Sequence, residues 1–540
     1  MCCPGAGWLM AGELSTRNLK IFRWTFSDRS LTMKAYLNAV AAFLDYGAQV
    51  AAALLVTPFV VRGLGSYFYG MWQLLNRLVG YVSPGSGRPT QALKFALAHQ
   101  QSSTDAESKR LAVGSAVVVW ALFLPIVTAG GAILTWAVPG WLGTAPEHAD
   151  YARWTVALLV FNLALGSLTS LPQSVLQGEN LGYKRMGLSA LFVFVGSSLV
   201  CAAVFMKLGI VGVAGATVAG TAVTGVFFHR VARKYAPWYG MSRPPTGDVR
   251  KFFGLSWYFM IWSLVIKVIM ASDVVVLGFL NSVESVTTYT LTKYTPETLV
   301  SIIAIMIAGI VPGLGGVLGS GDLRRAAQAR HEIMSLSWLI VTGIGATILV
   351  FNRTFVSMWV GPGFYAGTLA DLLIVTAVVQ LVFIRNDSAI IDVSLDLRRK
   401  VAVGSVAAAA SVTTACIGVR FVDPPVVGLS LGLIVGRAIL SVSYPRLINQ
   451  MLGSSRGSQF SVLGRPVAVT GALFVTAAAV SSFPTVLIGT GIRGWAFLAV
   501  SAGLICLVFM IAAFYAGLDA KERRAITRRM RALLNSGSGN

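Results

Sequence analysis

Long apolar runs, separated by short polar or glycine-rich segments, recur along nearly the whole chain and predict membrane-spanning helices. A helix of roughly 20 apolar residues crosses the hydrocarbon core of a bilayer. By this measure the chain contains about 14 spans. They cover residues 35–61, 67–82, 111–137, 151–171, 186–206, 209–228, 254–280, 295–319, 333–351, 369–384, 401–421, 424–445, 466–490 and 494–517.

Composition and charge agree with a multi-pass membrane protein. Of the 540 residues 55% are hydrophobic and 12% charged, and this balance excludes a soluble globular protein. A formal net charge of +22 would suggest nucleic acid as the partner of a soluble chain. Here most of the 43 Lys and Arg residues fall in the tails and in every second connection, which predicts that both termini are cytoplasmic. This asymmetry accounts for the charge without nucleic acid.

The remaining connections, predicted to lie outside, are short and hold few basic residues, among them Arg62, Lys207, Arg353 and Arg493. They leave no room for a folded external catalytic domain. Several tryptophans cluster near the predicted outer ends and are expected to be interfacial anchors. These are Trp136, Trp141, Trp154, Trp359 and Trp495.

Cysteine and histidine offer no framework for metal or redox chemistry. The five cysteines are scattered, and no Cys-x-x-Cys pair occurs. The four histidines lie in separate connections without ligand spacing, and no Gly-x-x-x-x-Gly-Lys-Ser/Thr motif is present. We therefore expect no metal, no cofactor and no intrinsic nucleotide hydrolysis.

Polar residues of the first span share one face. Asn38, Asp45 and Gln49 stand at i, i+7 and i+11, which places them on one narrow stripe of a helix. Burying an ionisable side chain against lipid costs about 2.5 kcal/mol or more, so the stripe should face other helices or a water-filled path. The structural alternative is an aspartate held in a helix–helix hydrogen bond.

The seventh span repeats this pattern. Ser256, Ser263 and Lys267 stand at the same intervals and end in a base. Lys267 and Asp273 are six residues apart, about 120° around a helix, and cannot form an i, i+4 pair. Each therefore needs a partner on another helix or in water.

Two further charges within spans have a simpler explanation. Arg77 and Arg437 lie near predicted inner ends, where long side chains can snorkel to the headgroups. Lys267, at the centre of its span, has no such route to the headgroups, and a cation there suits a pyrophosphate, which Lys or Arg can neutralise at low dielectric. The candidate substrate or ion pathway consists of Asn38, Asp45, Gln49, Arg77, Ser263, Lys267, Asp273 and Arg437.

An internal repeat indicates two lobes. Six spans per copy is an even number, so the copies insert in the same orientation, related by an axis along the membrane normal. Both copies carry a small-xxx-small ladder that allows close helix packing, with Gly212, Ala216 and Gly220 in the first and Gly428, Gly432 and Gly436 in the second.

The predicted fold is an all-α polytopic membrane protein with two pseudo-symmetric six-helix lobes plus two extra C-terminal helices. Its parts are a cytoplasmic tail at 1–34, an N-lobe at 35–240, a C-lobe at 241–448, two further spans within 449–518 and a basic cytoplasmic tail at 519–540.

Four segments carry a family resemblance: VTPFVVRGLGSYFYGMW at the end of the first span, DVVVLGFLNSVESVTTYTLT at the end of the seventh, VPGLGGVLGSGDLRRA, and MWVGPGF. They resemble oligosaccharide flippases of polysaccharide biosynthesis, including those of O-antigen, within the multidrug/oligosaccharidyl-lipid/polysaccharide exporter superfamily. The resemblance covers roughly residues 33–515.

This resemblance implies export of an undecaprenyl-pyrophosphate-linked oligosaccharide across the bacterial inner membrane by alternating access, for cell-surface polysaccharide such as lipopolysaccharide. The implied partners are the lipid-linked oligosaccharide, membrane lipids and, as candidates, the polysaccharide polymerase and chain-length machinery. The protein would be a transporter and not an enzyme.

Other functions remain open. A cation-coupled multidrug or metabolite extruder of the same superfamily would use Asp45 as a proton or sodium site, although Lys267 and Arg437 argue against cationic drugs. A lipid II flippase is a related branch. A membrane glycan polymerase or ligase would be expected to present acidic residues and large loops outside, and the outer connections are poor in both. The charges within spans disfavour a scaffold without transport.

Overall fold

The computed structural model describes residues 29–99, 105–142, 146–179, 181, 186–319, 323–394, 397–452, 457–481, 491–520, 522–524 and 527. Every element in this part of the chain is a helix. In order they are α1 (Arg29–Val82), η1 (Ser83–Ser86), α2 (Pro89–His99), α3 (Ala106–Trp141), α4 (Pro146–Thr169), α5 (Leu171–Gly178), α6 (Met186–Phe205), α7 (Gly209–Tyr235), α8 (Thr246–Leu280), α9 (Val283–Gly319), α10 (Leu323–Trp359), η3 (Pro362–Phe364), α11 (Thr368–Ser394), α12 (Leu397–Phe421), α13 (Pro425–Leu452), α14 (Gly457–Ser481) and α15 (Ile492–Gly517).

The predicted all-α membrane fold is confirmed. Eleven helices of the described chain are long and apolar enough to cross a membrane, or twelve when the two halves of the bent α8 count as one span. The first two predicted spans are the two halves of α1, which break at Gly65. This residue has a φ of 79°, a left-handed conformation that glycine adopts without steric cost. The glycine-rich turn seen in the sequence thus reverses the chain between two spans.

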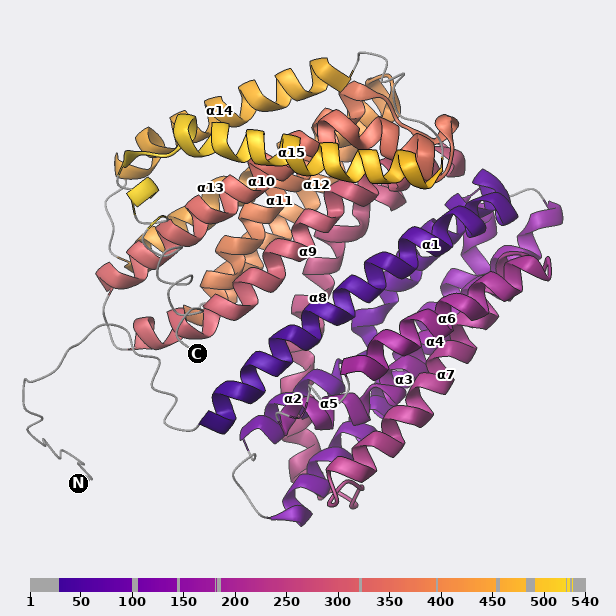
Figure 1. Ribbon diagram of the computed structural model, residues 1–540. Coiled ribbons are helices and arrows are strands. Elements are labelled where there is room, and N and C mark those ends of the chain that lie inside the picture. The colour runs from indigo at the N-terminus through magenta and orange to yellow at the C-terminus, as the bar shows by residue number, and fades with distance from the viewer. Residues whose placement is uncertain are drawn as a thin grey trace, which may run out of the picture.

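The helices form two lobes with the same internal contacts. In the N-lobe α1 packs on α6, and α4 packs on both α3 and α7. In the C-lobe α8 packs on α12, and α11 packs on both α10 and α13. The two groups lie beside each other in Figure 1, with α1 and α8 along their boundary. The repeated pairing agrees with the duplication inferred from the sequence.

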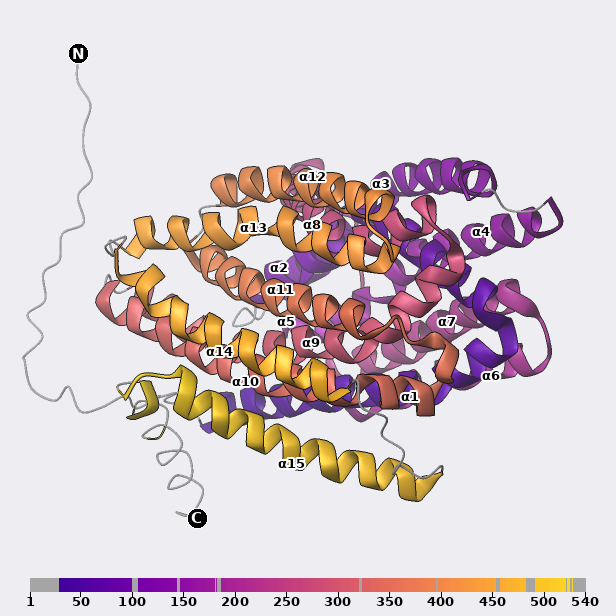
Figure 2. The ribbon, with the colours of Figure 1, turned by 90° about the horizontal axis from the view of Figure 1, so that it is seen from above.

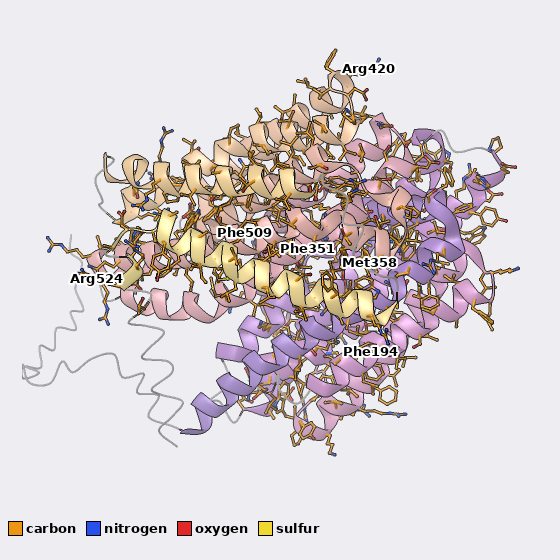
Figure 3. All side chains as sticks on the ribbon, turned by 45° about the horizontal axis from the view of Figure 1, so that its top comes forward. Phe194, Phe351, Met358, Arg420, Phe509 and Arg524 are labelled. Atoms are coloured by element: carbon orange, nitrogen blue, oxygen red, sulfur yellow. The ribbon has the colours of Figure 1, made fainter. Side chains whose placement is uncertain are left out.

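The last two long helices extend the C-lobe only. Both α14 and α15 pack on α10, and Figure 2 shows them on the side of the C-lobe away from α4 and α7. Phe509 on α15 packs on the cluster that contains Phe351 on α10, and Figure 3 labels both side chains. These two helices therefore widen one lobe without entering the contact between the lobes.

The two ends of the helix bundle carry different connections and short helices. One end carries the Gly65 break and the connections α3–α4, α8–α9, α10–α11 and α12–α13; we call it the Gly65 end, and the sequence predicts that it faces outward. The opposite end carries α2 and α5, which share an apolar cluster with α3 and the first half of α8. Arg420 lies at the Gly65 end (Figure 3).

Candidate functional site

The helix α8 is broken at mid-length, and charged side chains stabilise the break. Its axis bends by 51° between the segments Ser263–Met270 and Ser272–Leu280. Such a break frees backbone groups that lipid cannot satisfy. Arg437 of α13 donates from Nη2 to the Ile269 carbonyl oxygen at 2.9 Å, and Asp273 accepts from the Val274 amide at 2.8 Å. Thus a cation lies at the C-terminal end of the first half-helix and a carboxylate at the N-terminal start of the second, as the helix dipoles favour.

Asp273 is buried and finds its partners on α9. Its Oδ2 atom forms an ion pair with Lys293 Nζ and accepts a hydrogen bond from the Tyr289 hydroxyl at 2.8 Å. The charges of Arg77 and Arg437 also act on this carboxylate. Because Asp273 and Lys293 are both buried, replacing either partner would leave the other charge buried without its nearest counter-charge.

Further cations extend this site toward the end opposite Gly65. Arg77 Nη2 lies 3.8 Å from Glu297 Oε1, and Lys293 Nζ lies 3.9 Å from the same oxygen. The Arg77 and Glu297 side chains are 30% and 46% exposed, so solvent reaches this part. Lys267 is half-buried, and the charged groups that act on it are two more cations, Arg88 and Arg77.

We call this group the basic cluster. It joins α1 and the segment after η1 from the N-lobe with α8, α9 and α13 from the C-lobe. Among the residues that the structure describes, the cluster groups five cations with two carboxylates, so positive charge is in excess. Its members are Arg77, Arg88, Lys267, Asp273, Lys293, Glu297 and Arg437.

The structure brings together only some of the predicted pathway residues. Arg77, Lys267, Asp273 and Arg437 belong to the basic cluster, and Ser263 adjoins it because Arg88 Nη2 donates to its hydroxyl at 2.7 Å. On α1, Asp45 is half-buried and Gln49 is exposed. The side chain of Asn38 lies outside the described residues. Whether the α1 stripe serves transport stays a prediction.

The snorkelling explanation is wrong for Arg437. This side chain is 4% exposed and lies midway along α13, where it contacts the broken backbone of α8 instead of the headgroups. Its Nε atom has no hydrogen-bond partner within the described structure. The sequence suggested otherwise because its distance from the helix end was compatible with a long side chain reaching water.

Sequence reasoning missed Lys293, Glu297 and Arg88. The eighth span was predicted to begin at residue 295, whereas α9 begins at Val283, so Lys293 was assigned to a connection. The available signal was the spacing of Lys293 and Glu297, which is an i, i+4 ion pair in a segment rich in Thr and Tyr. Arg88 lies in a Gly-Arg-Pro segment that has no helical periodicity to place it.

The lobes are sealed at the Gly65 end by an apolar cluster, which we call the outer seal. It consists of Val60, Val61, Tyr69, Leu291, Val356, Trp359 and Val360. Across the same contact the Thr287 hydroxyl donates to the Ser66 carbonyl oxygen at 2.6 Å. The expected interfacial role of Trp359 is therefore wrong, because this side chain is 4% exposed and lies between the lobes. By contrast Trp136, Trp141 and Trp154 are exposed.

A second polar network belongs to the C-lobe alone. Asp371 of α11 is buried and accepts from Asn352 Nδ2 at 2.8 Å and from the Tyr365 hydroxyl at 3.2 Å. Burial and the neighbouring Asp371 raise the pKa of Tyr365 above its usual range, so its hydroxyl stays a donor. The Asn352 amide also donates to the Thr292 carbonyl oxygen at 2.9 Å. This network ties the α10–α11 connection to α9.

The N-lobe contains a pocket without charge. It is an open hollow with a volume of about 450 Å³, within the roughly 300–1,000 Å³ of small-ligand pockets. Hydroxyl groups and glycines dominate its wall, and these residues do not by themselves select one class of ligand. The wall is formed by Val56, Gly166, Thr169, Ser170, Gln173, Phe192, Val193, Gly196, Ser197, Val200, Thr217, Gly220, Thr221 and Thr224.

The fold resembles that of solved multi-pass membrane transporters. Residues of this chain superpose on an inward-facing multidrug resistance MATE family transporter of the MOP superfamily with a TM-score of 0.60 and 15% identity, covering 77% of this chain and 99% of the other. An outward-facing MATE transporter gives 0.54 and 15%, covering 78% and 97%. A MOP superfamily transporter from Pyrococcus furiosus, described as having a binding pocket of reverse polarity, gives 0.53 and 14%, covering 78% and 95%.

The family follows from the sequence. A model of the polysaccharide biosynthesis protein family matches residues 38–317, just over half of the chain, and the protein therefore belongs to this family. No curated protein matches the chain in sequence.

Proposed function

We propose that the protein carries an undecaprenyl-pyrophosphate-linked oligosaccharide across the plasma membrane by alternating access. The observation that supports this most directly is the excess of positive charge in the basic cluster, which lies between the lobes and within membrane-spanning helices. Such a charge is costly unless an anion completes it. A pyrophosphate offers two linked anionic groups to Lys and Arg, and membership of the polysaccharide biosynthesis family agrees with a glycan as cargo.

The division of the cluster suggests two tasks. Asp273, Lys293 and Arg437 are buried and hold the α8 break, so they set the geometry. Arg77 and Lys267 are partly exposed on the side opposite the outer seal, and these are the groups that would meet the pyrophosphate. With the Gly65 end facing outward, substrate would enter from the cytoplasm while the outer seal is closed, and release would require the seal to open.

The test is a flipping assay in proteoliposomes with a fluorescent undecaprenyl-pyrophosphate-linked oligosaccharide, scored by loss of fluorescence to an external quencher. Lys267→Gln and Arg77→Gln should each reduce the rate by about tenfold or more, because each removes a charge-assisted contact. Arg77→Lys should retain a substantial part of the rate. Protein abundance should stay near that of the parent, since both side chains reach solvent.

Gly247 on α8 offers a matched control, because it is exposed and far along the helix from the break. Gly247→Ala should transport normally. Normal transport by Lys267→Gln and Arg77→Gln would refute the role of the cluster. The alternative suggested by the fold of the MATE transporters is a multidrug extruder. It would be established if the parent protein moved a cationic dye such as ethidium in response to an ion gradient but did not move the lipid-linked glycan.

A further inference from the structure

A proline in α1 leaves one backbone carbonyl oxygen without its helical partner. In an α-helix the carbonyl of residue i accepts from the amide of residue i+4. The residue four positions after Leu54 is Pro58, which lies inside the continuous helical part of α1 and has no N–H. The Leu54 carbonyl oxygen therefore depends on a donor from elsewhere, since an unpaired carbonyl in an apolar setting is costly.

That donor comes from the other lobe. Trp359, at the end of α10 in the C-lobe, donates from its indole Nε1 to the Leu54 oxygen at 2.7 Å. The indole lies in the outer seal and packs against the ring of Tyr294 at a centroid distance of 4.7 Å. Because Trp359 belongs to the C-lobe, this hydrogen bond can exist only while the lobes are together at the Gly65 end.

We propose that Pro58, the Leu54 carbonyl and Trp359 form a latch that favours the state closed at the Gly65 end. In the closed state the indole satisfies the carbonyl that the proline has freed. In the open state the lobes separate, and water reaches the carbonyl instead. The proline thus creates an acceptor whose best protein partner is present only in the closed state. An interaction that one conformation makes and the other does not shifts the equilibrium between them.

The neighbouring contact shows what the proline adds. Tyr294 donates from its hydroxyl to the Val50 carbonyl oxygen at 3.4 Å, also across the lobes. Val50 lies four residues before Leu54, which has an amide, so this carbonyl keeps its helical hydrogen bond. The Tyr294 contact is longer and optional, whereas the Trp359 contact replaces a missing bond. Tyr294 therefore provides a matched control within the same surface.

The experiment measures how often the seal opens. Leu291, which is 1% exposed in the outer seal, is replaced by cysteine in a background from which the native cysteines have been removed. Reaction with a water-soluble maleimide in nanodiscs, without substrate, then reports the open population. Trp359→Phe keeps an aromatic ring but leaves the Leu54 carbonyl without a hydrogen-bond donor in the closed state only. The closed state is thereby destabilised, and the rate of maleimide reaction should rise about five- to 150-fold.

A double-mutant cycle with Pro58→Ala separates the hydrogen bond from ring packing. In the Pro58→Ala background the amide of residue 58 satisfies Leu54 in both states, so Trp359→Phe should change the rate by less than about threefold. Tyr294→Phe should have the same small effect in both backgrounds. An equal effect of Trp359→Phe with and without Pro58 would overturn the latch, as would no effect in either. Neither result depends on which substrate the protein carries.

Discussion

The two lobes repeat one arrangement of helices but differ in how tightly one equivalent pair packs. In the C-lobe the ladder of Gly428, Gly432 and Gly436 brings α13 against α12 so closely that a Cβ at any of the three would overlap neighbouring backbone. The equivalent pair in the N-lobe is α7 and α6. There a Cβ at Gly220 would lie 3.4 Å from the Gly196 Cα atom, an ordinary van der Waals contact, and both glycines line the uncharged pocket.

The comparison shows that small residues permit close packing without enforcing it. A glycine ladder removes the steric barrier between two helices, and the other contacts of each helix then decide whether they meet. In the C-lobe the Thr414 hydroxyl donates to the Gly432 carbonyl oxygen at 2.6 Å and joins the pair. In the N-lobe the Thr217 and Thr224 hydroxyls donate within α7 itself, to the Ala214 and Gly220 carbonyl oxygens, and so they do not join the two helices.

The largest effect is expected where the C-lobe buries charge. Asp273→Asn removes the carboxylate that compensates Lys293 and Arg437, and breaking a buried pair costs about 3–5 kcal/mol of unfolding free energy. Titration of the purified protein with SDS measures this loss. Lys267→Gln, on the same helix but half-buried, is the control and should cost less than about 1 kcal/mol. Equal losses would show that burial does not distinguish the two charges.

The ladders can be compared at equivalent positions. A Cβ at Gly436 would overlap the backbone of Ser411, so Gly436→Ala should destabilise by about 1–3 kcal/mol. At Gly220 the nearest atom would be 3.4 Å away. Gly220→Ala should be neutral or stabilise by up to about 1 kcal/mol, because alanine favours a helix. The same SDS titration measures both changes in stability. A larger loss for Gly220→Ala than for Gly436→Ala would contradict the difference in packing between the lobes.

Removing a hydroxyl group should also destabilise the C-lobe more than the N-lobe, but the difference should be smaller than that between the glycine variants. Thr414→Ala removes an interhelical hydrogen bond, worth about 0.6 kcal/mol within a membrane protein. Thr221→Ala changes only the pocket wall and should have an effect within about 0.5 kcal/mol of zero. Thermal melting of the two variants side by side resolves their order. A larger loss for Thr221→Ala would mean that the pocket hydroxyl holds helices together.

The smallest effect on stability is expected from filling the pocket. A Cβ at Gly196 would meet no atom within 4 Å, so Gly196→Leu can point into open space. Its melting temperature should match that of the parent within about 2 °C, which corresponds to less than 1 kcal/mol. For contrast, Gly418→Leu on α12 of the C-lobe would overlap the Gly428 carbonyl and should not accumulate. Loss of folded Gly196→Leu would show that the pocket is narrower than the structure indicates.

Much of the fold was predictable because it depends on local sequence. Apolar runs of the right length specify membrane helices, since each helix satisfies its own backbone in lipid. The Gly65 break was visible as a glycine-rich turn, and the paired lobes as a repeat. Helix ends were less certain: the polar residues near Lys293 made the start of α9 resemble a connection, although they pair inside the bundle.

The candidate site shows more clearly what the sequence could not predict. The sequence identified four charges of the basic cluster, Arg77, Lys267, Asp273 and Arg437, because any ionisable residue inside a span requires an explanation. It could not pair them. Asp273 meets Lys293 on the next helix and lies near Arg437, 164 residues later in the chain, and such contacts depend on which helix faces are turned toward each other.

The sequence by itself therefore determined that this is a polytopic membrane protein of two repeated lobes, with charge placed inside its spans, because hydropathy and spacing are local properties of a chain. Only the tertiary structure decided that Trp359 is buried between the lobes, that Arg437 supports a broken helix, and that one glycine ladder packs backbone against backbone while its repeat leaves room for a Cβ at Gly220. The physical reason is common to all three. Trp359 and the Leu54 carbonyl are 305 residues apart, and their hydrogen bond exists only because helices of the two lobes pack together at one end.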